Sequence, residues 1–352
     1  MSGAGLDPAE GARTCLRVDG SCRRGSGVAD RRQRRFSWSQ HGEYDGCVTK
    51  TPIHVPVLFR EVVEWINPQP GQIIVDGTLG GGGHTRLIAE RLAGSAGGGF
   101  VLALDRDPAA IAAAEKSLAG LPIKIAQADF CELPAVLDEL KIDFVDGVLL
   151  DLGLSSDQLA ADERGFSFDA IGPLDMRFDP EAGEPASKLL ERLPERELAN
   201  LIYKFGEERF SRRIARRIVE QRKERPIRTA DELAQLVRRC VPRSGDRIDP
   251  ATRTFQALRI AVNHELESLD LALARIPDRL RPSGKLAIIS FHSLEDRRVK
   301  EAFRSDPRLE SRTKKPICPT DEEAFRNPRS RSAKLRVAER VLGDTSPQRK
   351  QA

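Results

Sequence analysis

Four successive glycines follow an apolar run and are the residues best suited to chemistry in this 352-residue chain. The run at residues 73–76 ends in Asp76, and Gly80 to Gly83 then lead into a helix-like segment near His84. Glycine has no Cβ atom, so the backbone of such a loop can approach a bound molecule closely. A strand, a carboxylate, a glycine turn and a helix in this order predict a site for a nucleotide-like cofactor.

The spacing of the glycines narrows the choice of cofactor. A dinucleotide loop needs the frame G-x-G-x-x-G, but a frame that starts at Gly80 ends on Thr85, and no lysine is placed for a triphosphate. S-adenosylmethionine has no phosphate, and an acid at a strand end suits its ammonium group. Asp76, Gly80 and Gly82 fit the pattern acid-x-Gly-x-Gly-x-Gly, with Thr78 at the first glycine. The loop therefore predicts S-adenosylmethionine, with a merely flexible loop as the alternative.

Acids also end the next three strand-like runs, at residues 101–105, 123–126 and 145–151. Asp105 can accept both hydroxyls of a ribose. Asp129 can accept the adenine amino group, and the Phe130 ring can cover the base. Asp151 ends the fourth run, and the loop after it lines the same crevice. Each acid alone is a common loop cap, but four in consecutive units favour one cofactor site.

The order of the elements predicts an α/β fold, because strand-like and helix-like segments alternate. Further strands are expected at residues 285–291 and 334–339, and helices at 108–119, 133–140 and 294–304. We expect a disordered basic extension at 1–47, a core in two parts at 48–165 and 251–340, a helical insertion for substrate recognition at 166–250, and a tail at 341–352. Translation that begins near Val48 is a further hypothesis.

Composition limits the classes of partner. The chain carries a formal net charge of +4, which permits a nucleic acid without demanding one. No apolar run approaches the roughly 18 residues that span a bilayer, so no membrane partner is expected. Six cysteines occur without a C-x-x-C pair or zinc-finger spacing. We therefore expect no metal site and a reducing, cytoplasmic location.

The insertion contains an amphipathic helix at residues 207–224. Phe210, Ile214 and Ile218 recur at intervals of four and form an apolar stripe. Arginines cover the rest of its surface and are candidate phosphate contacts: Arg212, Arg213, Arg216 and Arg217. A solvated helix face, paired with neighbouring glutamates, is the alternative for this set.

Several motifs between residues 53 and 340 resemble, in the same order, those of the bacterial ribosomal RNA cytosine-N4 methyltransferases, the MraW-like family. They are HVPVL at 54–58, the glycine loop, DLGLSS at 151–156, RTFQALRIAVN at 253–263 and SFHSLED at 290–296. The resemblance implies a Rossmann-like class I methyltransferase fold with a mostly parallel sheet, and a cytosine of 16S ribosomal RNA near the decoding centre as substrate. It implies that S-adenosylmethionine contacts Gly82, Gly83, His84, Asp105, Phe130, Asp151 and Gln158.

Methylation of an exocyclic amine needs hydrogen-bond acceptors beside the nitrogen and an in-line approach to the methyl donor. Asp151 is the candidate catalytic acceptor, with main-chain carbonyls of the loop that follows it as the alternative. No covalent nucleophile is required, and none of Cys131, Cys240 and Cys318 has the Pro-Cys context of a C5 methyltransferase.

Further RNA contacts are expected after the insertion, because unstacked bases are read by arginine planes and polar side chains. The candidates are Arg253, Gln256, Arg259, Asn263, His292 and Ser293. A structural role is the open alternative for this polar set. The partner is either 16S RNA or an assembled small subunit, and a dimer is possible. A methyltransferase of another RNA or of a small molecule, or a non-catalytic assembly factor that binds RNA, is the alternative function.

Overall fold

The structure is a computed structural model that describes residues 15–17, 56–93, 98–155, 158–159, 162–168, 170–242 and 249–341. Most of the predicted extension at 1–47, the suggested start near Val48 and the tail after residue 341 lie outside the described residues. The exception is the short strand β1 (Cys15–Arg17), which the sequence did not predict and which pairs in parallel with β4.

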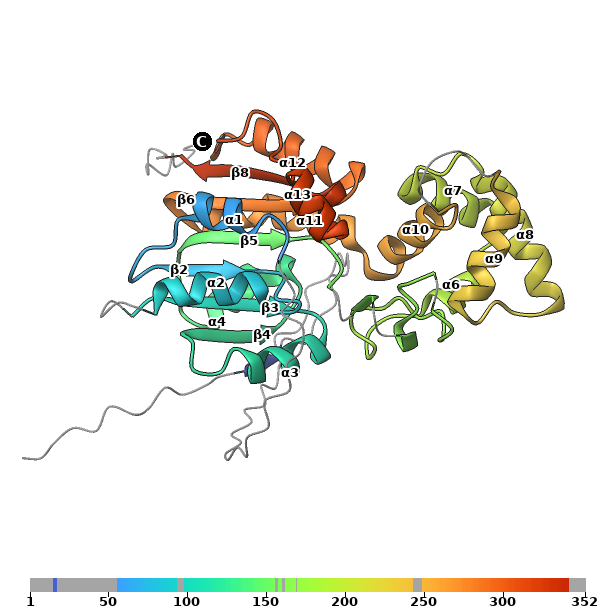
Figure 1. Ribbon diagram of the computed structural model, residues 1–352, viewed down its shortest axis with the longest axis horizontal. Coiled ribbons are helices and arrows are strands. Elements are labelled where there is room, and N and C mark those ends of the chain that lie inside the picture. The colour runs from blue at the N-terminus through green and yellow to red at the C-terminus, as the bar shows by residue number, and fades with distance from the viewer. Residues whose placement is uncertain are drawn as a thin grey trace, which may run out of the picture.

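A single sheet forms the centre of one lobe (Figure 1). Its order is β1-β4-β3-β2-β5-β6-β8-β7, and the strands as far as β6 are parallel while β8 and β7 pair antiparallel. The predicted α/β fold with a mostly parallel sheet is confirmed. The strands are β2 (Ile73–Asp76), β3 (Phe100–Asp105), β4 (Ile123–Gln127), β5 (Val145–Asp151), β6 (Leu280–Ser290), β7 (Leu309–Ser311) and β8 (Lys334–Arg340).

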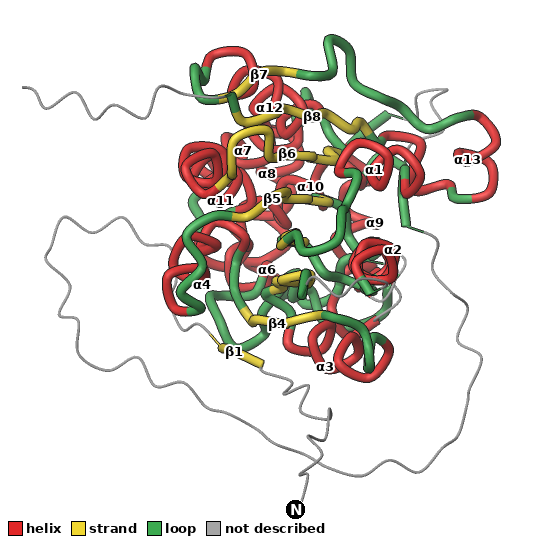
Figure 2. The backbone as a smooth tube through the Cα atoms, turned by 90° about the vertical axis from the view of Figure 1, so that its left-hand side faces the viewer, coloured by secondary structure: helices red, strands yellow, loops and turns green. Residues whose placement is uncertain are grey.

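Helices cover both faces of this sheet (Figure 2). Successive strand residues point to opposite faces, so Ile74 packs with α1 and α2 while Val75 packs with α4, α11 and α12. The central strands are therefore buried on both sides, which explains why they are apolar runs without alternation. The helices of this lobe are α1 (Phe59–Ile66), α2 (Gly83–Leu92), α3 (Pro108–Ser117), α4 (Leu133–Glu139), α11 (Glu265–Arg275), α12 (Ser293–Ser305) and α13 (Asp321–Arg326).

The insertion forms a second, helical lobe (Figure 1). It contains α6 (Ala186–Arg192), α7 (Glu195–Gly206), α8 (Ser211–Glu224) and α9 (Ala230–Cys240). Helix α10 (Thr252–Asn263) belongs with them, because its Phe255 and Leu258 pack in the same core as Ile214 and Ile218 of α8. The lobe thus continues past the predicted boundary at residue 250, and it returns to the sheet lobe at the junction of α10 and α11.

Helices α7 and α10 cross closely at Gly206. A Cβ atom there would lie far inside contact distance of the main-chain oxygen of Arg253. Glycine is the residue that permits this approach, and the crossing fixes how the end of α7 faces the sheet lobe.

The two lobes meet at the carboxyl ends of the parallel strands. The order of the sheet reverses between β2 and β5, and in such sheets ligands bind beside the carboxyl ends at this reversal. In Figure 1 the arrowheads of β2 and β5 point toward the helical lobe. Among the described residues, no helix has the length and apolar character needed to cross a membrane.

Candidate active site

A cavity opens at the junction of the lobes, with an empty volume of about 710 Å³ that is partly open to solvent. Its walls combine the loops after β2, β3, β4 and β5 with Phe178 of the helical lobe and the first turns of α11 and α12. Of the predicted cofactor contacts, the cavity is lined by Gly80, Asp105, Phe130, Asp151 and Gln158.

The glycine loop forms the floor of this site. Gly82 is the N-terminal cap of α2 and has a φ of 75°, a left-handed conformation that glycine adopts at little cost. The main-chain N–H of Leu79 donates to the oxygen of Leu104 over 2.8 Å, which ties the loop to β3. Gly82, Gly83 and His84 are not part of the cavity lining.

Asp105 is held at the end of β3 with its carboxylate in the cavity wall. It accepts the main-chain N–H groups of Gly80 and Asp107 over 2.8 and 2.9 Å. Burial raises the pKa of Asp105 to about 6, and these two hydrogen bonds only partly offset that effect. Each carboxylate oxygen has a further lone pair, so the group fits the two hydroxyls of a ribose.

The carboxylates of Asp76 and Asp129 accept hydrogen bonds from other side chains of the protein. Asp76 is buried below the loop, where Thr85 donates a hydroxyl to it over 2.6 Å; burial raises its pKa and this hydrogen bond opposes the rise. Asp129 caps the turn after β4 and accepts the hydroxyl of Ser268 over 2.8 Å, with Arg106 at 3.2 Å. Neither lines the cavity, so two of the four predicted acids, Asp105 and Asp151, face it.

Asp151 is positioned by contacts from three directions. Its main-chain N–H donates to the Thr78 hydroxyl over 2.6 Å, which gives a function to the residue that replaces the first glycine of the loop. One carboxylate oxygen accepts the N–H of Gly153 over 3.3 Å, and the other lies 3.4 Å from Nε2 of His84. The His84 side chain is only 6% exposed. The carboxylate thus contacts Gly153 and His84 while it lines the cavity.

Phe178 is a site residue that the sequence did not reveal. It comes from the helical lobe, and its main-chain N–H donates to the Asn263 side chain over 2.8 Å. Arg164 donates to its carbonyl oxygen over 2.8 Å and pairs with Asp107, while the Arg106 guanidinium lies 5.8 Å from the centre of its ring. The signal is absent from local sequence because these partners come from three other segments of the chain, around residues 106, 164 and 263.

Three predicted RNA contacts instead bond within the protein: Asn263 and Gln256 inside the helical lobe, and Arg259 across the junction with the sheet lobe. Asn263 is 1% exposed and donates to the carbonyl oxygen of Met176 over 2.7 Å. Gln256 donates to the carbonyl oxygen of Phe205 over 3.0 Å. Arg259 makes two hydrogen bonds of 2.8 Å to Glu265. The structure thus places these three side chains in internal contacts.

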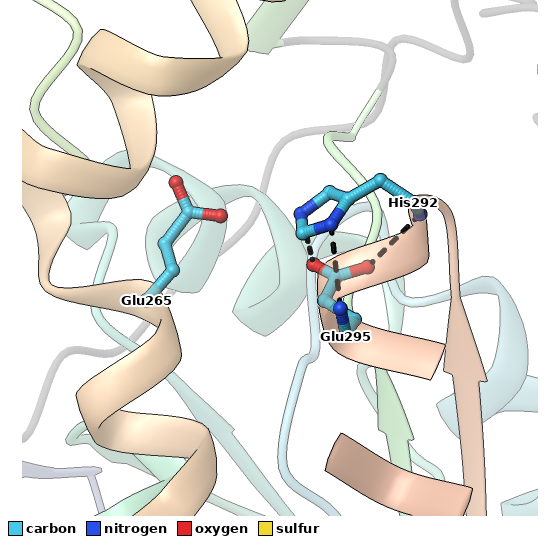
Figure 3. Close-up of side chains that lie close together, drawn as sticks. All are labelled: Glu265, His292 and Glu295. Atoms are coloured by element: carbon cyan, nitrogen blue, oxygen red, sulfur yellow. Dashed lines mark hydrogen bonds and ion pairs between the residues drawn. The ribbon is translucent and has the colours of Figure 1, made fainter. Parts of the chain in front are cut away.

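His292 and Glu295 form a reciprocal cap at the start of α12. The N–H of Glu295 donates to Nδ1 of His292, and the Glu295 carboxylate accepts the N–H of Phe291 over 2.8 Å. Glu265 lies on the facing helix, and one ligand atom from each of these three titratable side chains falls within 4.8 Å of the others (Figure 3). Since Arg259 and main-chain groups already engage the two carboxylates, this cluster is a network that positions α11 and α12.

The remaining predicted RNA contacts lie at the surface. Arg212, Arg213, Arg216 and Arg217 are exposed on α8, and Arg253 is exposed on α10. The pairs that they form there, such as Arg217 with Glu220 at 2.7 Å, are open to solvent. Ser293 is exposed beside the cap of α12 and donates its hydroxyl to Glu207 of the helical lobe.

Residues 51–341 match the sequence model of the MraW methylase family. The chain belongs to this family. Three relatives carry the name ribosomal RNA small subunit methyltransferase H. The one from Rhodopirellula baltica is 53% identical and covers 82% of this chain and 91% of its own. Those from Synechococcus elongatus and Pelobacter propionicus are 50% and 46% identical, cover 83% and 82% of this chain, and are themselves covered to 96% and 98%.

The predicted family and the prediction of a methyltransferase that uses S-adenosylmethionine are confirmed. The residues present fit that cofactor. Asp105 offers free acceptors for a ribose, Phe130 offers a ring in the wall, and the carboxylates of Asp105 and Asp151 suit a molecule with a cationic sulfonium. The roles of individual residues within this methylase stay predictions.

Proposed function

We propose that this methylase transfers a methyl group to the exocyclic N4 amine of a cytosine in small-subunit ribosomal RNA. The observation that carries the proposal is the position of Asp151: its oriented carboxylate lines the cavity where the two lobes meet. The proposal also rests on the names of relatives that share about half of the residues of the chain. Small subunits are made in the cytoplasm of bacteria, so we propose that location too.

Asp151 is proposed to act on the amine. The lone pair of this nitrogen is delocalised into the cytosine ring, and an acceptor that polarises an N–H bond makes it available. Bound S-adenosylmethionine supplies the methyl group as a sulfonium. The cofactor would give its methyl group to N4 and leave as the neutral thioether, and N4 would then give up a proton. The Asp151 carboxylate is the group placed to receive that proton, and it needs no covalent intermediate.

The remaining predicted contacts divide between cofactor and RNA. We propose that Asp105 binds the ribose and that Phe130 and Phe178 border the adenosine, since all three line the cavity. Gly82, Gly83, His84, Asp76 and Asp129 do not line the cavity, and for them we propose a supporting role around it. For RNA we retain Arg212, Arg213, Arg216, Arg217, Arg253, His292 and Ser293, which lie on exposed helix faces or at the start of α12.

The test is methyl transfer to small ribosomal subunits from cells that lack the gene. We expect the purified methylase to transfer labelled methyl groups from S-adenosylmethionine to these subunits, and nucleoside mass spectrometry to find N4-methylcytidine in the RNA. Naked 16S RNA, tested in parallel, identifies the form of the substrate. Label in another nucleoside, or transfer to small molecules alone, would contradict the proposal. Cofactor binding without any transfer would instead favour an assembly factor.

A further inference from the structure

A groove runs beside the active-site cavity, between the end of α7 and the first turns of α11 and α12. Its empty volume is about 760 Å³, and it is open to solvent. The helical lobe contributes Tyr203, Lys204 and Glu207, and the sheet lobe contributes Arg297 and Arg298. No sequence motif indicated Tyr203, Lys204, Arg297 or Arg298. None of the five residues lines the cofactor cavity.

The groove lies next to the active-site cavity. Leu266 and Leu294 line the groove, while their chain neighbours Glu265 and Glu295 line the cavity. The two hollows therefore share the first turns of α11 and α12. A polymer with one unit in the cavity would have its neighbouring units in the groove.

An exposed aromatic ring and three cations line this surface. Tyr203 is 64% exposed, so its ring is accessible to a ligand in the groove. Lys204 is exposed beside it, and Arg297 and Arg298 lie across the groove on α12. Aromatic faces that stack bases, set among cations that bind phosphates, are the features with which proteins bind single-stranded nucleic acid. The apolar floor is small, since Leu266 and Leu294 are buried.

The acids at the groove occupy the positions where phosphates would bind. Glu207 accepts the hydroxyl of Ser293 and lies 3.4 Å from Arg297, so one carboxylate bridges the lobes. Asp270 lies 3.1 Å from Arg298. These pairs are exposed, with Glu207 and Asp270 side chains at 46% and 57%, and water screens exposed ion pairs so that they stabilise a structure little. A phosphate can therefore displace Glu207 at little cost.

We propose that this groove binds the single-stranded RNA next to the target base, with a base stacked on Tyr203 and a phosphate held by Ser293 and Arg297 in place of Glu207. This inference rests on the proposed function and adds a strand path to it. Glu207 acts as an internal competitor, which occupies Ser293 and Arg297 while RNA is absent.

The experiment measures the affinity of the full-length protein for unmethylated small subunits, and the kcat and KM of methyl transfer, at several salt concentrations. Tyr203→Ala should weaken binding about tenfold while Tyr203→Phe, which keeps the ring, stays within about twofold. Arg297→Gln should reduce the slope of log affinity against log salt by about 0.7, the value for one phosphate of a single strand. Glu207→Gln should bind more tightly, because the competing charge is removed.

The matched controls are Arg312→Gln and Glu310→Gln, an exposed pair of the same kind beside the outer strand β7. Both should leave affinity, salt slope and turnover as in the parent protein. Affinity for S-adenosylhomocysteine, measured by calorimetry, should be the same in all groove variants.

Two failures are distinguishable. If the parent protein methylates subunits but Tyr203→Ala binds as tightly and Glu207→Gln more weakly, the strand path is wrong and the proposed function stands. If the parent protein transfers no methyl group to RNA, the proposed function and this inference fall together.

Discussion

The two lobes organise their functional side chains in opposite ways. In the sheet lobe, Asp105 and Asp151 reach the cavity because each ends a parallel strand, so topology alone brings them to one edge. In the helical lobe, Phe178 reaches the same cavity through hydrogen bonds to Asn263 and Arg164, which are far away in sequence. The sheet thus sets the positions of the two carboxylates. The position of Phe178, in contrast, depends on hydrogen bonds to other segments of the chain.

This difference separates two kinds of polar residue that look alike in the sequence. Arg213 and Arg259 both lie on amphipathic helices of the helical lobe. Arg213 is exposed on α8, whereas the side chains of Arg259 and Glu265 are only 15% and 11% exposed and form a two-bond pair. Variants at the strand ends should therefore lower turnover. Variants of the Arg259–Glu265 pair should lower stability, and variants of the exposed arginines should lower RNA affinity.

The largest effect is expected at Asp151. Asp151→Asn keeps the size of the side chain but removes the charge that polarises the amine and receives its proton, so kcat should fall about 10²- to 10³-fold. Single-turnover methyl transfer to small subunits measures this, and Asp143→Asn, an exposed acid just before the same strand, is the control. Affinity for S-adenosylhomocysteine should change less than about tenfold. An equal loss of cofactor affinity and turnover would assign Asp151 to cofactor binding alone.

The second-largest effect is expected at the Arg259–Glu265 pair, which joins α10 of the helical lobe to α11 of the sheet lobe. Arg259→Gln leaves Glu265 without its partner in a nearly dry site, and breaking such a pair should lower the free energy of unfolding by about 3 kcal/mol. Arg213→Gln should leave stability within about 0.5 kcal/mol and weaken RNA binding instead. Urea unfolding and subunit binding measure the two quantities. Stability loss in Arg213→Gln, or none in Arg259→Gln, would contradict the distinction.

The sequence predicts the sheet lobe well because its signals are local. The bounds expected for β2 and β5 agree with the structure, and Asp105 and Asp151 lie where strand ends were expected to place them. A strand that is buried on both faces must be an apolar run, and a loop beside a ligand needs glycine. Both requirements are visible within ten or so residues.

The rest could not be predicted because it depends on distant partners. Asn263 lies on the polar side of α10 by periodicity, yet it is buried because Met176 and Phe178 of a distant loop pack over it. The short strand β7 has only three residues, and it pairs with β8 inside a stretch that reads as irregular. For such elements the partner, rather than the local sequence, decides the structure.

Asp105 provides a pH test of the cofactor site. Burial raises its pKa to about 6, so in the free protein the stability that the neutral carboxyl contributes is lost as pH rises through about 6. Ribose hydroxyls donate to the ionised form, so cofactor affinity should have the opposite trend and fall up to about tenfold per pH unit below 6. Calorimetry with S-adenosylhomocysteine from about pH 5 to pH 8 measures it. Asp105→Asn should bind S-adenosylhomocysteine weakly, and its affinity should not change with pH near 6. A pH dependence that persists in this variant would be due to another titratable group.

The smallest expected effect compares two adjacent glycines of the loop. Gly82 has a φ of 75° and the space beside it ends at Leu118, 3.0 Å from the position of an added Cβ atom, whereas a Cβ atom at Gly81 would meet nothing within 4 Å. Gly82→Ala should therefore lower the free energy of unfolding by about 1–2 kcal/mol, the cost of a left-handed conformation for alanine, and weaken cofactor binding. Gly81→Ala should change neither. Thermal unfolding and calorimetry of the pair compare them directly. Equal effects would contradict this prediction, because both the backbone conformation and the nearby Leu118 distinguish Gly82 from Gly81.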